Sequence, residues 1–462
     1  MFLGQGNQQP ERRLADYQQE LYDKLGTTVL HPVGAVFFGL MTLWTFLVPR
    51  CYVIWALLFT ACFISPGQRF AFFTIDFHFQ RAIIVVILFR ILIMSEFQGI
   101  KLRGIDYAIF GCALSLILAT LLGGRSQFFL PVAGRAADGI GIYLIARAYV
   151  RQLEDLRAVL LGAAIAAVPV MIGFIIEKST TNNMFSVFGG VPPITVLRDG
   201  KLRAQGAYTH PIIAGAFWAT FVPLFFAVVL AKARTIRAVI TGWVGTISAV
   251  IAALMTASST PIGGLLIGFG TWCLFPFRGH LRIIRWGVFF VLVSLHLLSD
   301  RGVHGVIFTK FNFIAASTGY HRYQLIQGAI DGFSQWALLG HRGTHFNRAY
   351  DDVTNDYIAL ALNGGLAAVV LKITAIVLAF ISIGKLMRAV QNNRSDLFLA
   401  YGLGAALLTV TITMLAVSMY HQGEIPVFLT LGMAASLGDP QWLPGMRNSQ
   451  APMPMNTPST PS

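Results

Sequence analysis

The sequence predicts an all-α protein that crosses a membrane many times, and three observations lead to this fold class. Only 12% of the 462 residues are charged and 55% are hydrophobic, whereas soluble domains carry roughly a quarter charged residues. Apolar runs of roughly 17 to 25 residues, long enough to cross a bilayer as helix, recur along the chain. The alternating segments of about ten residues that mark an outer-membrane barrel are not seen in the sequence.

Thirteen apolar segments are candidate spans, so we expect a polytopic protein of about 12 to 13 transmembrane helices. They are residues 31–48, 51–65, 82–94, 105–122, 128–150, 156–176, 211–231, 238–255, 261–275, 284–298, 357–383, 397–419 and 425–437. We therefore expect a single membrane domain over residues 31–440. It follows an N-terminal polar segment (1–30) and precedes a tail (441–462) that is rich in Pro, Ser and Met and predicted to be disordered.

Positive charge in the short loops orients the chain, because cytoplasmic loops carry an excess of Lys and Arg. The basic clusters that we place in the cytoplasm are Lys101/Arg103, Arg151/Arg157, Lys232/Arg234/Arg237, Arg278/Arg282/Arg285 and Lys385/Arg388/Arg394. The loops at about 177–210 and 299–356 then share the opposite face. Two spans before residue 82 would put Met1 on that face despite Arg12 and Arg13, so one of the first two segments could instead be re-entrant or interfacial.

The net charge of +14 has an ordinary explanation in these cytoplasmic loops. No basic run or stacking-aromatic motif accompanies it, so we predict no nucleic-acid partner. An anionic, lipid-linked substrate would account for the remaining excess of positive charge.

The first of the two loops carries cations beside a predicted helix start. Arg198 and Arg203 precede the pair His210-Pro211, and Pro suits the first turn of a helix. The free N–H groups at such a helix start attract anions. This loop therefore predicts an anion site that includes Arg203, with Arg198 and His210 nearby; the alternative is that these cations only solvate the loop.

The second loop is a polar island of about 60 residues crowded with His, Arg and Asp. Its segment 321–340 has apolar residues at helical spacing, so we expect an amphipathic helix on the membrane surface with Arg322 at its start. A guanidinium matches phosphate oxygens in bidentate fashion. The alternative is that Arg322 is a snorkelling interfacial cation.

The end of this loop holds candidates for a general base. His345, Asp352 and Asp356 lie close together in sequence, just before a span. Histidine is the commonest general base and titrates near neutrality, whereas a carboxylate at residue 356 would be fixed by the helix start. His341 and His345 are spaced for a metal, but no predicted helix carries them and no cysteine joins them. We predict neither metal nor cofactor.

Three ordered segments resemble one family of membrane enzymes. RAQGAYTHPIIAGAF, RYQLIQGAIDGFSQWALLGHRG and VTNDYIALALNGGLAAVVLK are similar to motifs of the O-antigen ligase and O-antigen/exopolysaccharide polymerase superfamily. The resemblance covers roughly residues 198–372 in motif. It covers the whole chain in layout, which has many spans, two outward loops, and the longer loop late in the chain.

The resemblance implies a GT-C-like, metal-independent glycosyltransferase of the bacterial inner (cytoplasmic) membrane. Such an enzyme takes a glycan from undecaprenyl diphosphate at the periplasmic face and joins it to a hydroxyl of a glycan acceptor. By motif, Arg203 and Arg322 would hold the lipid diphosphate, and Asn355 and Tyr357 match the family's substrate-site pattern. Fixed cations would stabilise the charge that builds on the leaving diphosphate. A chain-length regulator is a further possible partner.

Two departures from the family pattern bear on which of its members this chain resembles. Thr354 stands where the ligases carry a histidine, and residues 258–261 lack the family's mid-chain arginine. They favour a polymerase that extends a capsular or exopolysaccharide repeat over an O-antigen ligase that acts on lipid A-core. The role of base would then pass to Asp356, with His345 and Asp352 as alternatives.

Two other classes of function stay open. A transporter, such as a flippase for lipid-linked sugars, would place charge inside its spans. Candidate in-span charges are Arg90, Arg135, Asp138 and Arg147. A structural scaffold in the membrane would tolerate replacement of the loop arginines. Because the charge is densest in the loops and no internal repeat is visible, we favour the enzyme.

Overall fold

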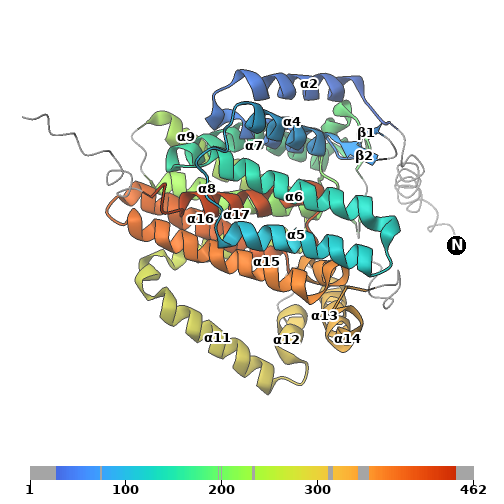
Figure 1. Ribbon diagram of the computed structural model, residues 1–462, viewed down its shortest axis with the longest axis vertical. Helices are drawn as coiled ribbons and strands as arrows, with labels where there is room; N and C mark the ends of the chain where they lie inside the picture. Colours follow the sequence, from blue (N-terminus) through green and yellow to red (C-terminus); the bar gives the residue numbers. More distant parts are fainter. Residues whose placement is uncertain are drawn as a thin grey trace, which may run out of the picture.

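The protein is an all-α helical bundle with the apolar helices of a polytopic membrane protein (Figure 1). The computed structural model describes residues 28–72, 75–195, 197–198, 200–231, 235–310, 316–341 and 353–443. About 76% of it is helical. Its described strands form two antiparallel hairpins, β1 (Arg69–Phe72) with β2 (Ile75–His78) and β3 (Leu197–Arg198) with β4 (Lys201–Leu202).

Each of the thirteen predicted segments forms a helix. These are α2 (Pro32–Leu47), α3 (Ile54–Phe63), α4 (Phe79–Ile93), α5 (Gly104–Leu122), α6 (Phe129–Tyr149), α7 (Leu153–Thr180), α8 (Pro211–Leu230), α9 (Ile236–Met255), α10 (Ser259–Cys273), α11 (Leu281–Leu298), α15 (Asp356–Ala389), α16 (Arg394–Thr413) and α17 (Glu424–Leu437). In the described part of the chain, eight helical stretches are long and apolar enough to cross a membrane; they correspond to α5–α9, α11, α15 and α16. The other five helices have 10 to 16 residues, below the length that a span normally needs.

Shorter elements complete the fold. The 3-10 turns are η1 (Arg50–Tyr52), η2 (Ser126–Phe128), η3 (Met184–Phe188), η4 (Phe275–His280) and η6 (His421–Gly423). The second loop contains α12 (Gly302–Lys310), α13 (Ala316–Asp331) and α14 (Phe333–Trp336). The single amphipathic helix predicted over 321–340 is therefore two helices. They meet at Gly332, a residue of low helix propensity.

The helices differ in how far they are enclosed. α8 lies at the centre of the bundle, where Trp218, Phe221 and Phe225 are fully buried. α15 packs along α5. By contrast α11, drawn in yellow at the bottom of Figure 1, extends away from the bundle and has no buried residue. A long, mostly apolar helix that no described part of the protein covers is suited to contact with lipid.

The ends of the helices fall into two groups. At one end, distant segments are joined by ion pairs such as Arg103–Asp439, at 2.9 Å, and Arg157–Asp396, at 2.7 Å; the described basic clusters lie here. The opposite end, which we call the loop end, consists of residues 181–195, 197–198, 200–210, 299–310, 316–341 and 414–423 together with the helix termini that they join. Both predicted outward loops thus gather at the same end of the bundle, as far as the structure describes them.

The first two helices form an antiparallel pair that runs between the two ends. The backbone N–H of His31, before α2, donates to Gln68 at the loop end, and Trp44 near the end of α2 donates to the carbonyl of Tyr52. α3 then runs back toward the loop end. There, Arg69 in the chain after α3 forms an antiparallel β-bridge with Val29. Neither helix reverses its direction within the bundle. The chain before α2 therefore lies at the loop end, and so does residue 28.

α15 is broken near its start. Gly365 has φ +70° and ψ −171°, which interrupts the helical hydrogen bonds. The turn after α14 satisfies the freed groups, because the N–H of Leu366 donates to Ala337 and the N–H of His341 donates to Leu362, both at 2.8 Å. Broken helices are tolerated at membrane depth where protein supplies such partners.

Arg125, in the loop between α5 and α6, donates further hydrogen bonds at the break in α15. Its guanidinium donates to the carbonyls of Leu339, Leu362 and Asn363 at 3.0, 3.1 and 2.8 Å. The side chain is buried, and burial lowers its pKa. One buried cation thus joins α14 and the first part of α15 to α5 through backbone dipoles.

We predict that Gly365→Ala destabilises the protein. A Cβ at this residue would lie 2.6 Å from the carbonyl oxygen of Leu338, and its φ of +70° disfavours any L side chain. Strain of this kind costs about 1 to 3 kcal/mol, so the melting temperature in detergent should fall. Gly384→Ala, on the same helix with open space around its Cβ, is the control and should be neutral or stabilising. Equal melting temperatures for the two variants would contradict the break at Gly365.

The two ends of the bundle should lie on opposite sides of the membrane. Single cysteines at Lys201 and Asp331, both exposed at the loop end, should react with an impermeant thiol reagent from one side, and a cysteine at the exposed Asn392 from the other. Cys51 and Cys273, which have accessible surface, are first replaced by Ser. Labelling of all three sites from one side would show that the bundle does not span the membrane in this way.

Candidate functional site

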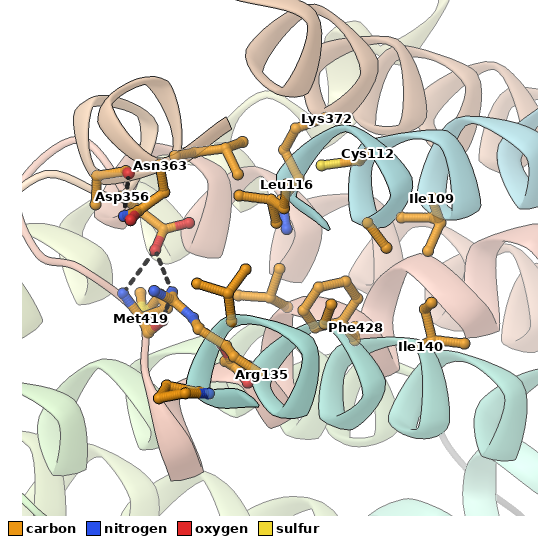
Figure 2. Close-up of a pocket in the computed structure, with 18 of the residues that line it drawn as sticks. Ile109, Cys112, Leu116, Arg135, Ile140, Asp356, Asn363, Lys372, Met419 and Phe428 are labelled. Carbon is orange, nitrogen blue, oxygen red and sulfur yellow. Dashed lines mark hydrogen bonds and ion pairs between the residues drawn. The ribbon is translucent and has the colours of Figure 1, made fainter. Parts of the chain in front are cut away.

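A cavity of about 320 Å³ lies between α5, α6, α15 and α17 (Figure 2). Most of its wall is apolar, but four charged side chains line it: Arg135, Asp356, Lys372 and Glu424. Cavities of this size, apolar with a few polar groups, are typical of small-molecule sites. Ionisable groups enclosed by membrane-spanning helices commonly mark function.

Three of these charges form one ion-pair cluster at the polar end of the cavity. The Arg135 Nε lies 2.6 Å from Glu424 Oε1, and another guanidinium nitrogen lies 3.3 Å from Asp356 Oδ1. The same guanidinium donates to the carbonyl of Met419. Figure 2 shows Arg135 and the Met419 backbone converging on the Asp356 carboxylate. One cation from α6 thereby holds the carboxylates that begin α15 and α17.

Local sequence fixes the Asp356 carboxylate. Asn355 caps α15, its side-chain oxygen accepting from the N–H groups of Tyr357 and Ile358 at 3.0 and 3.1 Å. The N–H of Met419 donates to Asp356 Oδ1 at 2.9 Å. Asp356 is buried, so a carboxylate held by a cation and a backbone N–H faces the cavity.

A second charged cluster lies beside the first. On α6, one turn beyond Arg135, the Asp138 carboxylate accepts from the guanidinium of Arg81 at 2.8 Å and lies 3.5 Å from the ring of His78. The His78 ring contacts that of His421 at 5.0 Å between centroids. Burial, with the nearby His78, lowers the pKa of His421 to about 3, so His421 is neutral at ordinary pH.

Arg203 and Arg322 meet on one turn, between α9 and α10. Arg203 donates to the carbonyl of Thr256, at 3.4 Å, and to the hydroxyl of Ser258. Arg322, from α13, donates to the hydroxyl of Thr260 at 2.8 Å. Burial lowers the pKa of Arg322. Two guanidinium groups that are far apart in sequence thus donate to the same turn, residues 256–260.

This turn has the properties of an anion site. Ser258 precedes the first turn of α10 and makes no side-chain cap, so the positive end of the helix lacks an internal acceptor. The sequence predicts the anion at the free N–H groups at the start of α8 instead, and one of these groups has an acceptor within the protein. The Nδ1 of His210 accepts from the N–H of Ile212 at 3.1 Å, which makes His210 the cap of α8.

The turn at 256–260, with Arg203 and Arg322, and the Asp356 carboxylate lie on neighbouring elements of the loop end. On α13, Leu325 and Ala329 pack against Ile358 near the start of α15. The backbone N–H of Asp356 donates to Met414, just after α16, at 2.8 Å, and α10 packs along α16. The structure therefore brings these two predicted parts of the site to one region.

The other predicted site residues have different positions. His345 and Asp352 lie outside the described residues. Arg198 lies on β3, and its side chain is outside the described part. Asn355 uses its amide to donate to Leu415 at 3.0 Å, and the Tyr357 hydroxyl donates to Thr411 at 3.1 Å. Both side chains thus hold the start of α15 in place.

Sequence analysis missed two of the four charged residues of the cavity, Glu424 and Lys372, and noted Arg135 only as an in-span charge. Arg125, at the break in α15, was not singled out either. An ionisable residue inside an apolar segment is a signal that could have found Lys372. The other in-span candidates form ion pairs, Arg90 with Glu96 at 3.1 Å and Arg147 with Asp106 at 3.0 Å.

Among the residues that the structure describes, no three His, Cys, Asp or Glu side chains are placed to hold a metal ion. In comparisons with known proteins, no family model matches the chain and no curated protein is found to be similar to it. The geometry of the loop end and the cavity therefore carries the functional argument.

Proposed function

We propose that this protein is a polysaccharide polymerase of the bacterial inner membrane. It would join oligosaccharide repeat units, carried on polyprenyl diphosphate, into a capsular or exopolysaccharide chain, with its loop end in the periplasm. The observation that carries the proposal is the convergence of Arg203 and Arg322 on the α9–α10 turn.

A diphosphate leaving group fits this turn. When a sugar leaves a diphosphate, negative charge builds on the phosphate oxygens, and fixed cations and backbone N–H groups stabilise it. Two guanidiniums and an uncapped helix start supply both kinds of partner at one place. The two arginines also offset the charge that a divalent metal would otherwise neutralise, so we propose a metal-independent reaction.

Asp356 is the proposed general base for the acceptor hydroxyl. Its Oδ1 is held by Arg135 and by the N–H of Met419, while in the described part of the chain Oδ2 accepts no hydrogen bond. A hydroxyl at about 2.6 to 3.2 Å from Oδ2 could transfer its proton there. Arg135 would then act as a positioning residue that keeps the carboxylate aimed into the cavity.

A transporter for lipid-linked sugars is the second candidate, because two observations favour it. The cavity holds four charged side chains between helices, and α15 is broken at Gly365. Transporters often bind their substrates beside broken helices near the middle of the membrane. The two functions differ in product, since a transporter moves single repeat units across the membrane without joining them.

The first functional prediction concerns geometry at the two arginines. Arg203→Lys and Arg322→Lys each retain a positive charge but lose the two-pronged match to phosphate. In cells that depend on this protein, polymer should fall by roughly tenfold or more, as expected for loss of a charge-assisted contact of about 1.5 to 3 kcal/mol. Arg301→Lys, an exposed cation of the loop end, is the matched control. Polymer at the wild-type level from well-expressed Arg203→Ala or Arg322→Ala protein would reject the site.

The second functional prediction concerns the base. Asp356→Asn retains the shape of the side chain but cannot accept the proton, so polymer should be lost while lipid-linked single repeats accumulate. Asp300→Asn, which changes an exposed carboxylate of the loop end, should leave polymer length unchanged. Gel analysis of polymer and extraction of the lipid-linked pool measure both outcomes. Near-normal polymer from Asp356→Asn would assign the base to another residue.

A further inference from the structure

Lys372 is a buried cation that the proposed reaction does not use. It lies in the middle of α15 with 5% of its surface exposed. Its ammonium lies 4.2 Å from the centre of the Phe428 ring. Among the described residues it has neither a carboxylate partner nor a hydrogen-bond acceptor, although its nitrogen reaches the cavity.

The nearby carboxylates do not satisfy this lysine. Asp356 and Glu424 both pair with Arg135, and neither lies within ion-pair distance of Lys372. A ring face stabilises a desolvated cation only in part, because removing an ammonium from water costs more free energy than the ring contact returns. An acceptor that entered the cavity would offset the rest of this cost.

The cavity is polar at one end and apolar at the other. In Figure 2, Lys372 lies between Asp356 and Arg135 on one side and the apolar residues Ile109 and Ile140 on the other. α5 and α6 supply the apolar end, and both are long enough to cross a membrane. A ligand here would place a polar head near the lysine and an apolar chain between these helices.

We propose that this cavity binds a single-chain amphiphile with one carboxylate head, of the fatty-acid class. The head would accept from the Lys372 ammonium, and the chain would occupy the apolar end beside Ile109 and Ile140. The site shares its cavity with Asp356, the proposed base, but is distinct from the turn that carries Arg203 and Arg322. Binding at Lys372 is measured without glycosyl transfer, so failure of one proposal leaves the other standing.

A carboxylate fits better than a phosphate for a simple reason of charge. Lys372 is one compact point charge, and the other cation of the cavity, Arg135, is held by two carboxylates. A phosphate monoester carries up to two negative charges and is better matched by guanidiniums with several donors. One ammonium suits one monoanionic head.

The proposal is tested by measuring binding to the purified full-length protein in a neutral maltoside detergent. Octanoate, octyl phosphate and octanol serve as probes with the same chain and different heads, each displacing a fluorescent fatty acid. Octanoate should bind at least about tenfold more tightly than octanol, as expected for a charge-assisted hydrogen bond away from water. Equal affinities for octanoate and octanol would overturn the proposal, and tighter binding of octyl phosphate would overturn the carboxylate assignment.

Two variants assign the binding to the cavity. Lys372→Gln should lose the preference for octanoate over octanol, whereas Lys385→Gln, an exposed lysine of the same helix, should keep it. Ala113→Phe keeps the lysine but fills the cavity beside it, and should weaken both probes by at least about tenfold. Unchanged octanoate binding in a folded Lys372→Gln or Ala113→Phe protein would contradict the site. If Lys372→Gln does not fold, the Ala113→Phe variant and the head-group comparison on the native chain decide.

Discussion

The structure depends on one constraint, that a charge or freed backbone group enclosed among membrane helices needs a partner within the protein. Arg147 is fully buried and pairs with Asp106 at 3.0 Å. Arg125 donates to three carbonyls around the break in α15, and Arg135 joins the starts of α15 and α17. Lys372, with an aromatic ring as its only described partner, departs from this rule and so points to a ligand.

Much of the fold could be predicted from the sequence, because a bilayer leaves few alternatives to the helix. All thirteen apolar segments are helices, and the described parts of both polar loops share one end of the bundle. The lengths of the helices were less predictable. Hydropathy cannot tell a span from a short buried helix such as α17, whose 14 residues are apolar because protein surrounds them. The break at Gly365 was missed because its partners come from the turn after α14 and from Arg125 in the α5–α6 loop, and no pattern around Gly365 itself indicates these contacts.

The site was predicted only in part, and for a similar reason. Cations in a loop indicate phosphate chemistry, so Arg203 and Arg322 could be selected from sequence. Their common turn could not, since it belongs to α10 rather than to the helix start at Pro211. Asp356 could be selected from its place before a span, but its partners Arg135 and Glu424 come from α6 and α17. Such pairings depend on packing between helices, which no local pattern records.

The most direct measurement is a reaction with purified protein in liposomes, supplied with polyprenyl-diphosphate-linked repeat units on the side of the loop end and an excess of EDTA. The account predicts glycan chains of several repeats, with one polyprenyl diphosphate released for each new linkage. Movement of single repeats across the bilayer without new linkages would contradict it in favour of a transporter. Linkage that requires one specific divalent ion would contradict the role given to the two arginines.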